Sequence, residues 1–165
     1  MRAFRISSLF ACLLLLAVTC AAQGDANNKS EAQRLNVSEA DLAAIKQAAT
    51  DYCESWYEGS TEKIERAVHP DLAKRIVRHD PQGKNGRLDH MGAMRLYQNV
   101  RSGYGKKTPK EKQLKEVTVL DVLGNAASVK AVMSDWIDYM HVAKINGRWV
   151  IVNVLWEMKP QPPQQ

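Results

Sequence analysis

Apolar residues recur at helical spacing through the first half of the chain. The longest stripe predicts a helix from Ser38 to Gly59, with Asp41 three residues after Ser38 as in a capping box. A second, shorter helix capped by Ser60 or Thr61 is expected to end at His69-Pro70-Asp71. A third helix, capped by Asp89, carries its apolar face at Met91, Met94, Tyr97 and Val100.

The pattern then changes from helical to alternating. Residues 73–78 form a plausible short strand, and residues 80–86 have the composition of a turn. Two later pairs of alternating runs surround Gly124-Asn125 and Asn146-Gly147, which predicts two β-hairpins. Helices first and antiparallel strands later predict an α+β fold. We expect three N-terminal helices packed on a curved antiparallel sheet of about four to six strands, forming a cone with an internal pocket.

Pairing across Asn146-Gly147 assigns side chains to two faces. One face receives Asp138, Met140, Val142, Trp149, Ile151, Asn153 and Leu155. The other receives Tyr139, His141, Ala143, Val150, Val152, Val154 and Trp156. The first face is assigned to the interior because Asp138 and Asn153 need hydrogen-bond partners or a wet pocket. A bulge between Ser134 and Asp138 would reverse the faces for the earlier part of that strand. Both faces are strongly apolar, which predicts a homodimer through the outer sheet face.

The two ends of the chain differ in composition from the domain. Residues 1–22 have a basic start, a short apolar run and small residues at the exit, which predicts a cleaved signal peptide and a periplasmic or secreted product. The apolar run is too short to cross a bilayer, so no transmembrane segment is expected. The stretch that ends at Cys20 also has some features of a lipobox, so a lipoprotein anchored through Cys20 is the alternative. We expect residues 23–36 to be a flexible linker, residues 37–159 the folded domain and residues 160–165 a disordered tail.

Charge and cysteine content exclude several functions. Loss of a leader of residues 1–22, which holds two arginines and no acidic residue, lowers the formal net charge from +5 to +3. This balance does not favour nucleic-acid binding. The four histidines lack close pairing with cysteine or carboxylate, so neither a metal site nor a cofactor is expected. Cys53 lies on the apolar helix stripe and is expected to be a core residue.

Three segments resemble the "Putative lumazine-binding" family of the nuclear transport factor 2-like superfamily. They are residues 52–59, residues 65–75 and the hairpin of residues 138–157, and the likeness extends over roughly residues 38–159. The resemblance implies a dimerising scaffold with an internal cavity, on which relatives include ketosteroid isomerase, scytalone dehydratase, polyketide cyclases and plain binding or assembly modules. It implies the fold, and the fold by itself does not decide the function.

The expected function is therefore an exported module that binds a small apolar or aromatic molecule. The candidate ligand-binding residues are Trp56, Tyr57, His69, Asp138, Met140, Trp149 and Asn153. One alternative is a cofactor-free isomerase or dehydratase acting on a hydrophobic carbonyl compound, with Asp138 as the candidate catalytic base. A second alternative is an accessory protein-interaction domain whose cavity is vestigial.

Overall fold

The computed structural model describes residues 27–160. Its helices are residues 27–34, α2 (Glu39–Glu58), α3 (Thr61–Ala67) and α4 (Ala93–Arg101), with short 3-10 turns η1 (Tyr104–Lys107) and η2 (Lys110–Lys112). Its strands are β1 (Val68–His79), β2 (Gly86–Gly92), β3 (Lys115–Leu123), β4 (Ala126–Met133), β5 (Trp136–Ile145) and β6 (Arg148–Met158). None of the helices in this part of the chain combines the length and apolarity needed to cross a membrane.

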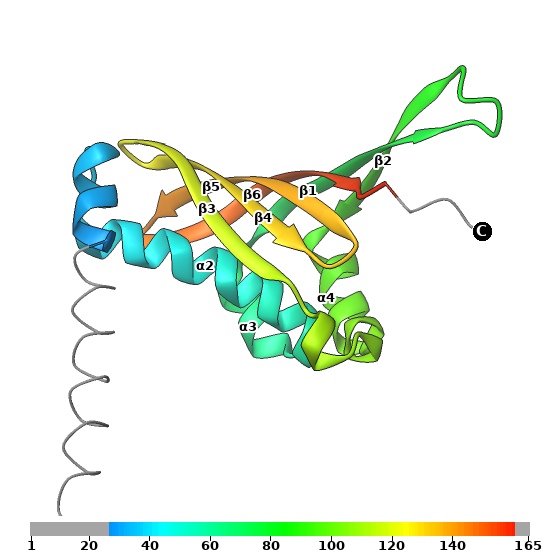
Figure 1. The fold of residues 1–165 in the computed structure, drawn as a ribbon, viewed down its shortest axis with the longest axis horizontal. Coiled ribbons are helices and arrows are strands. Elements are labelled where there is room, and N and C mark those ends of the chain that lie inside the picture. The colour runs from blue at the N-terminus through cyan, green and yellow to red at the C-terminus, as the bar shows by residue number, and fades with distance from the viewer. Residues whose placement is uncertain (1–26, 161–165) are drawn as a thin grey trace, which may run out of the picture.

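The strands form one curved, open sheet, and the helices lie against one of its faces (Figure 1). The strand order is β2-β1-β6-β5-β4-β3, and every neighbouring pair is antiparallel except β1–β6, which is parallel. The predicted fold class is therefore confirmed: this is an α+β protein with helices packed on a bent six-stranded sheet.

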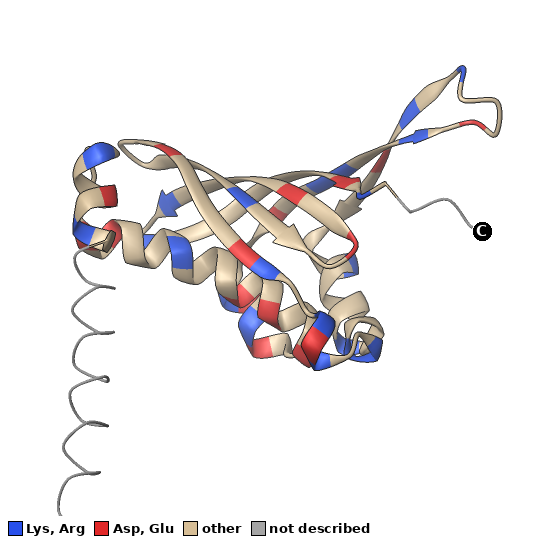
Figure 2. Ribbon diagram, in the orientation of Figure 1, with Lys and Arg blue, Asp and Glu red and all other residues tan. Residues whose placement is uncertain are grey.

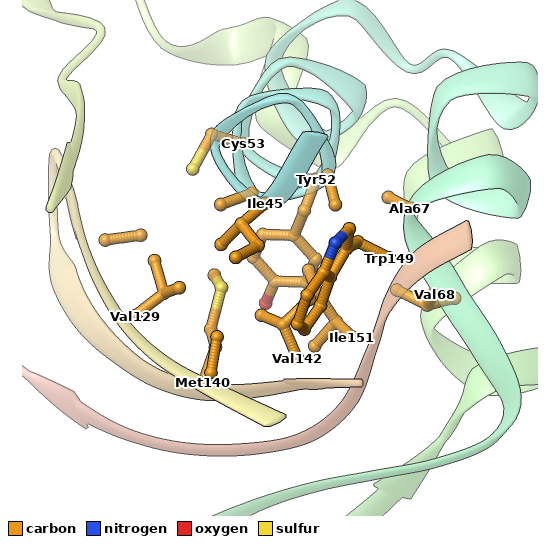
Figure 3. Packing of buried hydrophobic residues seen from close by; sticks show 14 of the residues in the cluster. Ile45, Tyr52, Cys53, Ala67, Val68, Val129, Met140, Val142, Trp149 and Ile151 are labelled. Atoms are coloured by element: carbon orange, nitrogen blue, oxygen red, sulfur yellow. The ribbon is translucent and has the colours of Figure 1, made fainter. Parts of the chain in front are cut away.

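The core lies between α2 and the concave face of the sheet. Figure 3 shows Ile45, Tyr52 and Cys53 of α2 facing Met140 and Val142 of β5 and Ile151 of β6. These residues are at most 4% exposed. Burial of the predicted α2 stripe against alternate residues of the strands supplies most of the hydrophobic stabilisation that holds the helix on the sheet.

Both predicted hairpins form. Asn146 and Gly147 have φ angles of 50° and 79°, the two positive values that a type I′ turn requires, and Ile145 pairs with Arg148. Gly124 has φ of 58° at the first position of the other two-residue turn, and Leu123 pairs with Ala126.

Residues 68–92 form a hairpin rather than the predicted helix ends. His69-Pro70-Asp71 lies within β1, so α3 ends two residues before His69. Asp89 lies in β2, where it pairs with Ile76 of β1, and it does not cap a helix. Helix α4 begins after Gly92. The helical spacing at Met91 misled the prediction because ladder pairing with β1 overrides a weak local preference for helix.

The predicted flexible linker is wrong for residues 27–36. Residues 27–34 are helical, and Ala32 and Leu35 are 3% and 6% exposed in the core. Glu31 also forms an ion pair with Lys46 of α2, at 2.6 Å between oxygen and nitrogen. The helix of residues 27–34 has too few apolar residues to show a periodic stripe in the sequence. The predicted signal peptide, the first part of the linker and residues 161–165 of the predicted tail lie outside the described residues.

A β-bulge in β6 changes the faces of the C-terminal hairpin. Ile151 pairs with Val142 as predicted, but Asn153 pairs with His141, which leaves Val152 as the extra residue. Beyond the bulge, Val154 and Trp156 take the inner face. The prediction that Asn153 and Leu155 face the interior is therefore wrong, and the bulge lies on β6 rather than near residues 134–138.

Candidate functional site

A cavity of about 260 Å³ opens beside the C-terminal half of α2. It lies between α2, α3, α4, the middle of β1, the end of β2, the start of β5 and the end of β6. The lining side chains are mostly apolar or aromatic: Tyr52, Ser55, Trp56, Ile64, Lys74, Met91, Leu96, Asn99, Val100, Asp135, Trp136, Trp156 and Met158.

Three tryptophans form the aromatic wall of this cavity. The ring centroids of Trp56 and Trp136 are 5.5 Å apart at an interplanar angle of 87°, and those of Trp136 and Trp156 are 6.1 Å apart at 72°. Both are edge-to-face contacts, an arrangement that aromatic pairs favour and that fixes the relative tilt of the rings. The three rings come from α2, β5 and β6, so only the folded chain brings them together.

Lys74 of β1 supplies the charged group of the wall. Its Nζ donates to the hydroxyl of Tyr52 at 2.6 Å and to a carboxylate oxygen of Asp138, and it lies 4.8 Å from the centroid of the Trp156 ring. The second carboxylate oxygen of Asp138 accepts from Trp136 Nε1 at 2.8 Å. The side chains of Lys74 and Asp138 are 6% and 0% exposed. Their opposite charges therefore compensate each other in a region from which water is excluded.

The surroundings shift two pKa values in this group. Burial lowers the pKa of the Lys74 ammonium, although the Asp138 carboxylate opposes that shift. Burial also raises the pKa of the Tyr52 phenol well above its usual value, and the negative charge of Asp138 adds to the effect. Tyr52 is therefore a neutral hydrogen-bonding group at physiological pH.

Of the predicted site residues, the structure brings Trp56 and Asp138 to this region. Trp56 lines the cavity directly. Asp138 faces the interior as expected, but it lies behind Lys74 with both oxygens engaged. Lys74, rather than Asp138, is thus the charged residue that lines the cavity.

The remaining predicted residues lie elsewhere. Tyr57 donates to the carbonyl oxygen of Leu114 at 2.9 Å, His69 accepts from the backbone nitrogen of Asp71, and Met140 is a core residue. Trp149 donates from Nε1 to Asp41 at 2.8 Å, which ties the start of α2 to the C-terminal hairpin. Asn153 accepts from Arg75 at 2.8 Å on the other side of the sheet.

Lys74, Trp136 and Trp156 were not identified from the sequence. For Lys74 a signal existed, because it stands between Leu72 and Ile76 at the spacing of one strand face, and both neighbours are 3% exposed. Trp156 was assigned to the outer face only because the bulge was missed. No group of three potential metal ligands occurs within residues 27–160.

Comparison with known families gives a match over most of the domain. The family described as "Putative lumazine-binding" matches residues 40–157. The chain belongs to this family. The lumazine-binding match spans α2 through β6, and so includes every element that lines the cavity.

Solved structures agree with the lumazine-binding assignment at the level of fold. An NTF2-like protein of unknown function from Shewanella baltica is 16% identical with a TM-score of 0.58, covering 73% of this chain and 95% of that chain. An NTF2-like protein from Methylobacillus flagellatus is 19% identical with a TM-score of 0.55, covering 76% and 98%. A Nostoc punctiforme protein with a cystatin-like fold is 15% identical with a TM-score of 0.54, covering 76% and 96%. A search of curated sequences gives no match.

Proposed function

We propose that this protein is a small-molecule-binding module whose cavity holds an aromatic or otherwise apolar ligand. The observation that carries the proposal is a cavity of about 260 Å³ walled by three tryptophans, with one buried ammonium group at its edge. A mostly apolar hollow with a small number of placed polar groups is the usual form of a ligand site. The name of the matched family, "Putative lumazine-binding", is consistent with a planar heteroaromatic ligand.

The polar edge of the cavity suits a ligand that carries a hydrogen-bond acceptor. Two donor positions of the Lys74 ammonium are used by Tyr52 and Asp138, and an ammonium has three. The remaining hydrogen is available to a carbonyl or ring nitrogen of a ligand that stacks near Trp156. The tryptophans would contribute apolar contact, and Lys74 would fix the orientation.

The two alternative functions receive less support from the geometry. Catalysis by Asp138 as a general base requires contact with the substrate, and its carboxylate is fully buried behind Lys74 and does not line the cavity. An interaction domain with a vestigial cavity is expected to have that cavity filled by side chains, whereas this one has room for a ligand.

Native mass spectrometry and calorimetry test the proposal together. Protein purified from its own host is expected to carry a co-purifying small molecule, and purified protein is expected to bind naphthalene-2-carboxamide, a neutral aromatic amide. Asn99→Trp places a large ring in the cavity and should abolish binding. Gln98→Trp, on the exposed side of the same helix, should leave binding unchanged. Equal binding by both variants would show that the ligand sits elsewhere.

We also propose that the outer face of the sheet forms a homodimer. Three large apolar side chains are exposed on neighbouring strands of this face: Val77 at 38%, Tyr139 at 48% and Leu155 at 47%. No element of the described chain covers them, and a second copy would bury them by symmetry. Light scattering should give twice the chain mass for the wild type and the monomer mass for Tyr139→Lys/Leu155→Lys. Leu123→Lys, at the tip of the β3–β4 hairpin, is the control and should stay dimeric.

Export through the N-terminal leader remains part of the proposal. Mass spectrometry of the mature protein should show loss of residues 1–22. Retention of Cys20 as a lipid-modified N-terminus would instead support the lipoprotein alternative, and an intact Met1 in the cytoplasm would contradict both.

A further inference from the structure

A second hollow, of about 200 Å³, adjoins the ligand cavity between the β1–β2 hairpin and the start of α4. It shares Lys74, Met91 and Trp156 with the cavity, so the two spaces have a common wall. In contrast to the first, its other lining residues are largely charged, and they include Arg78 and Arg95. We call this second hollow the arginine cleft.

The arginine cleft has an excess of positive charge. Lys74 is neutralised by Asp138, while Arg78 and Arg95 share the lining of the cleft with one carboxylate, that of Asp89. Within residues 27–160, no ion pair involves Arg78, Arg95 or Asp89. Figure 2 shows several basic residues along the β1–β2 hairpin, where it extends past the rest of the sheet.

Two structural features direct these charges towards the shared wall. Lys74, Ile76 and Arg78 are spaced two apart on one face of β1, and the guanidinium of Arg78 lies 5.4 Å from the centroid of the Trp156 ring. Arg95 stands in the first turn of α4, which has no side-chain cap and no acidic residue. The partial positive charge at a helix N-terminus adds to that of Arg95 and favours an anion there.

We propose that the natural ligand is an aromatic acid: its ring occupies the tryptophan cavity and its carboxylate or phosphate group enters the arginine cleft. This inference rests on the proposed binding function and narrows the class of ligand. An arginine can bind either anion through two parallel hydrogen bonds, and both Arg78 and Arg95 line the cleft that the anion would enter. A ligand without charge would leave the arginine cleft unused.

Calorimetry with a pair of nearly isosteric probes tests the anionic group. Naphthalene-2-carboxylate should bind about tenfold more tightly than naphthalene-2-carboxamide, because a charge-assisted bond to arginine is stronger than a neutral one. The double variant Arg78→Gln/Arg95→Gln should lose this preference and bind the two probes with similar affinity. Arg101→Gln, an exposed arginine at the other end of α4, removes a charge outside the arginine cleft and should retain the full preference. Naphthalene-2-yl phosphate, measured in parallel, distinguishes a phosphate from a carboxylate.

The outcomes distinguish failure of the acidic-ligand proposal from failure of the proposed binding function. If the wild type binds carboxamide and carboxylate equally, the acidic ligand is wrong while the binding function stands. If the double variant keeps the preference, or loses both probes while its circular dichroism is unchanged, the assignment to these arginines is wrong. If the wild type binds no probe, the binding function fails and this inference fails with it.

Discussion

Lys74 and Asp138 are oppositely charged, buried and dependent on one another. Tyr52 and Trp136 add hydrogen bonds to the pair in an otherwise apolar region. Among the described residues, no buried side-chain nitrogen or oxygen is left without a partner. The arrangement holds a cation at the tryptophan-lined cavity without leaving an uncompensated charge in the core.

Removing one member of this pair should be more harmful than removing the charge of both. Lys74→Met leaves the Asp138 carboxylate buried without its cation, and we expect the free energy of unfolding to fall by about 3–5 kcal/mol. Lys74→Met/Asp138→Asn keeps an acceptor for Trp136 and should recover part of that loss. Urea unfolding of both variants gives the comparison, and a double variant no more stable than Lys74→Met would argue against a coupled pair.

Asp41 gives a residue-level prediction about pH. Hydrogen bonds from Lys144 and Trp149 lower the pKa of Asp41 from 3.8 to about 2. A lowered pKa in the folded state means that the carboxylate stabilises the fold above about pH 4 and that this contribution is lost as the pH falls towards about 2.

Asp41→Asn should therefore cost roughly 1 kcal/mol at pH 7, a value reduced by partial solvent exposure, and almost nothing at pH 2. Chemical denaturation at both pH values measures the difference. A constant cost across this range would mean that the hydrogen bonds do not depend on the charge.

At the scale of elements, Trp56 is positioned by the turn that follows α4. Gly105 of η1 is buried against α2, and an added Cβ would overlap the carbonyl oxygen and the indole ring of Trp56. The absence of a side chain at this position allows η1 to approach α2 and to keep the Trp56 ring in the cavity wall.

Gly105→Ala should consequently destabilise the protein by about 1–3 kcal/mol and weaken binding of naphthalene-2-carboxamide. Gly92→Ala is the matched control, since its Cβ would meet its nearest neighbour, the carbonyl oxygen of Leu72, at 3.8 Å. Thermal unfolding and calorimetry of the two variants should separate them. Equal effects would show that close approach at Gly105 is unimportant.

At the scale of the whole molecule, the N-terminal helical segment closes one end of the core. Its Ala32 and Leu35 are buried, and Lys46 bonds to both Asn28 and Glu31. A protein that begins at Val37 should unfold about 2 kcal/mol more easily than one that begins at Gln23, because two buried apolar residues are lost. The tryptophan-lined cavity is at the other end of α2, so binding of naphthalene-2-carboxamide at low temperature should be unchanged. Equal stability of the two forms would return residues 23–36 to the role of a linker.

The sequence by itself determined the elements whose signals are local. The α2 stripe from Leu42 to Trp56 and the turns at Gly124-Asn125 and Asn146-Gly147 depend on residues near in the chain, so the fold class and the two hairpins followed from them. The positions of Trp56 in the cavity wall and of Asp138 on the inner face also followed, since both lie within strongly periodic segments.

Only the tertiary structure decided which groups meet at the site. The Val152 bulge replaces Asn153 and Leu155 with Val154 and Trp156 on the inner face. Because both faces of β6 are rich in apolar residues, this one-residue shift leaves no visible change in the sequence pattern. The parallel contact of β1 with β6 brings Lys74 alongside Val154, and so towards Asp138 on the next strand, across 64 positions of sequence. Such a contact forms because burying either charge alone is costly, and that cost appears only when distant strands become neighbours.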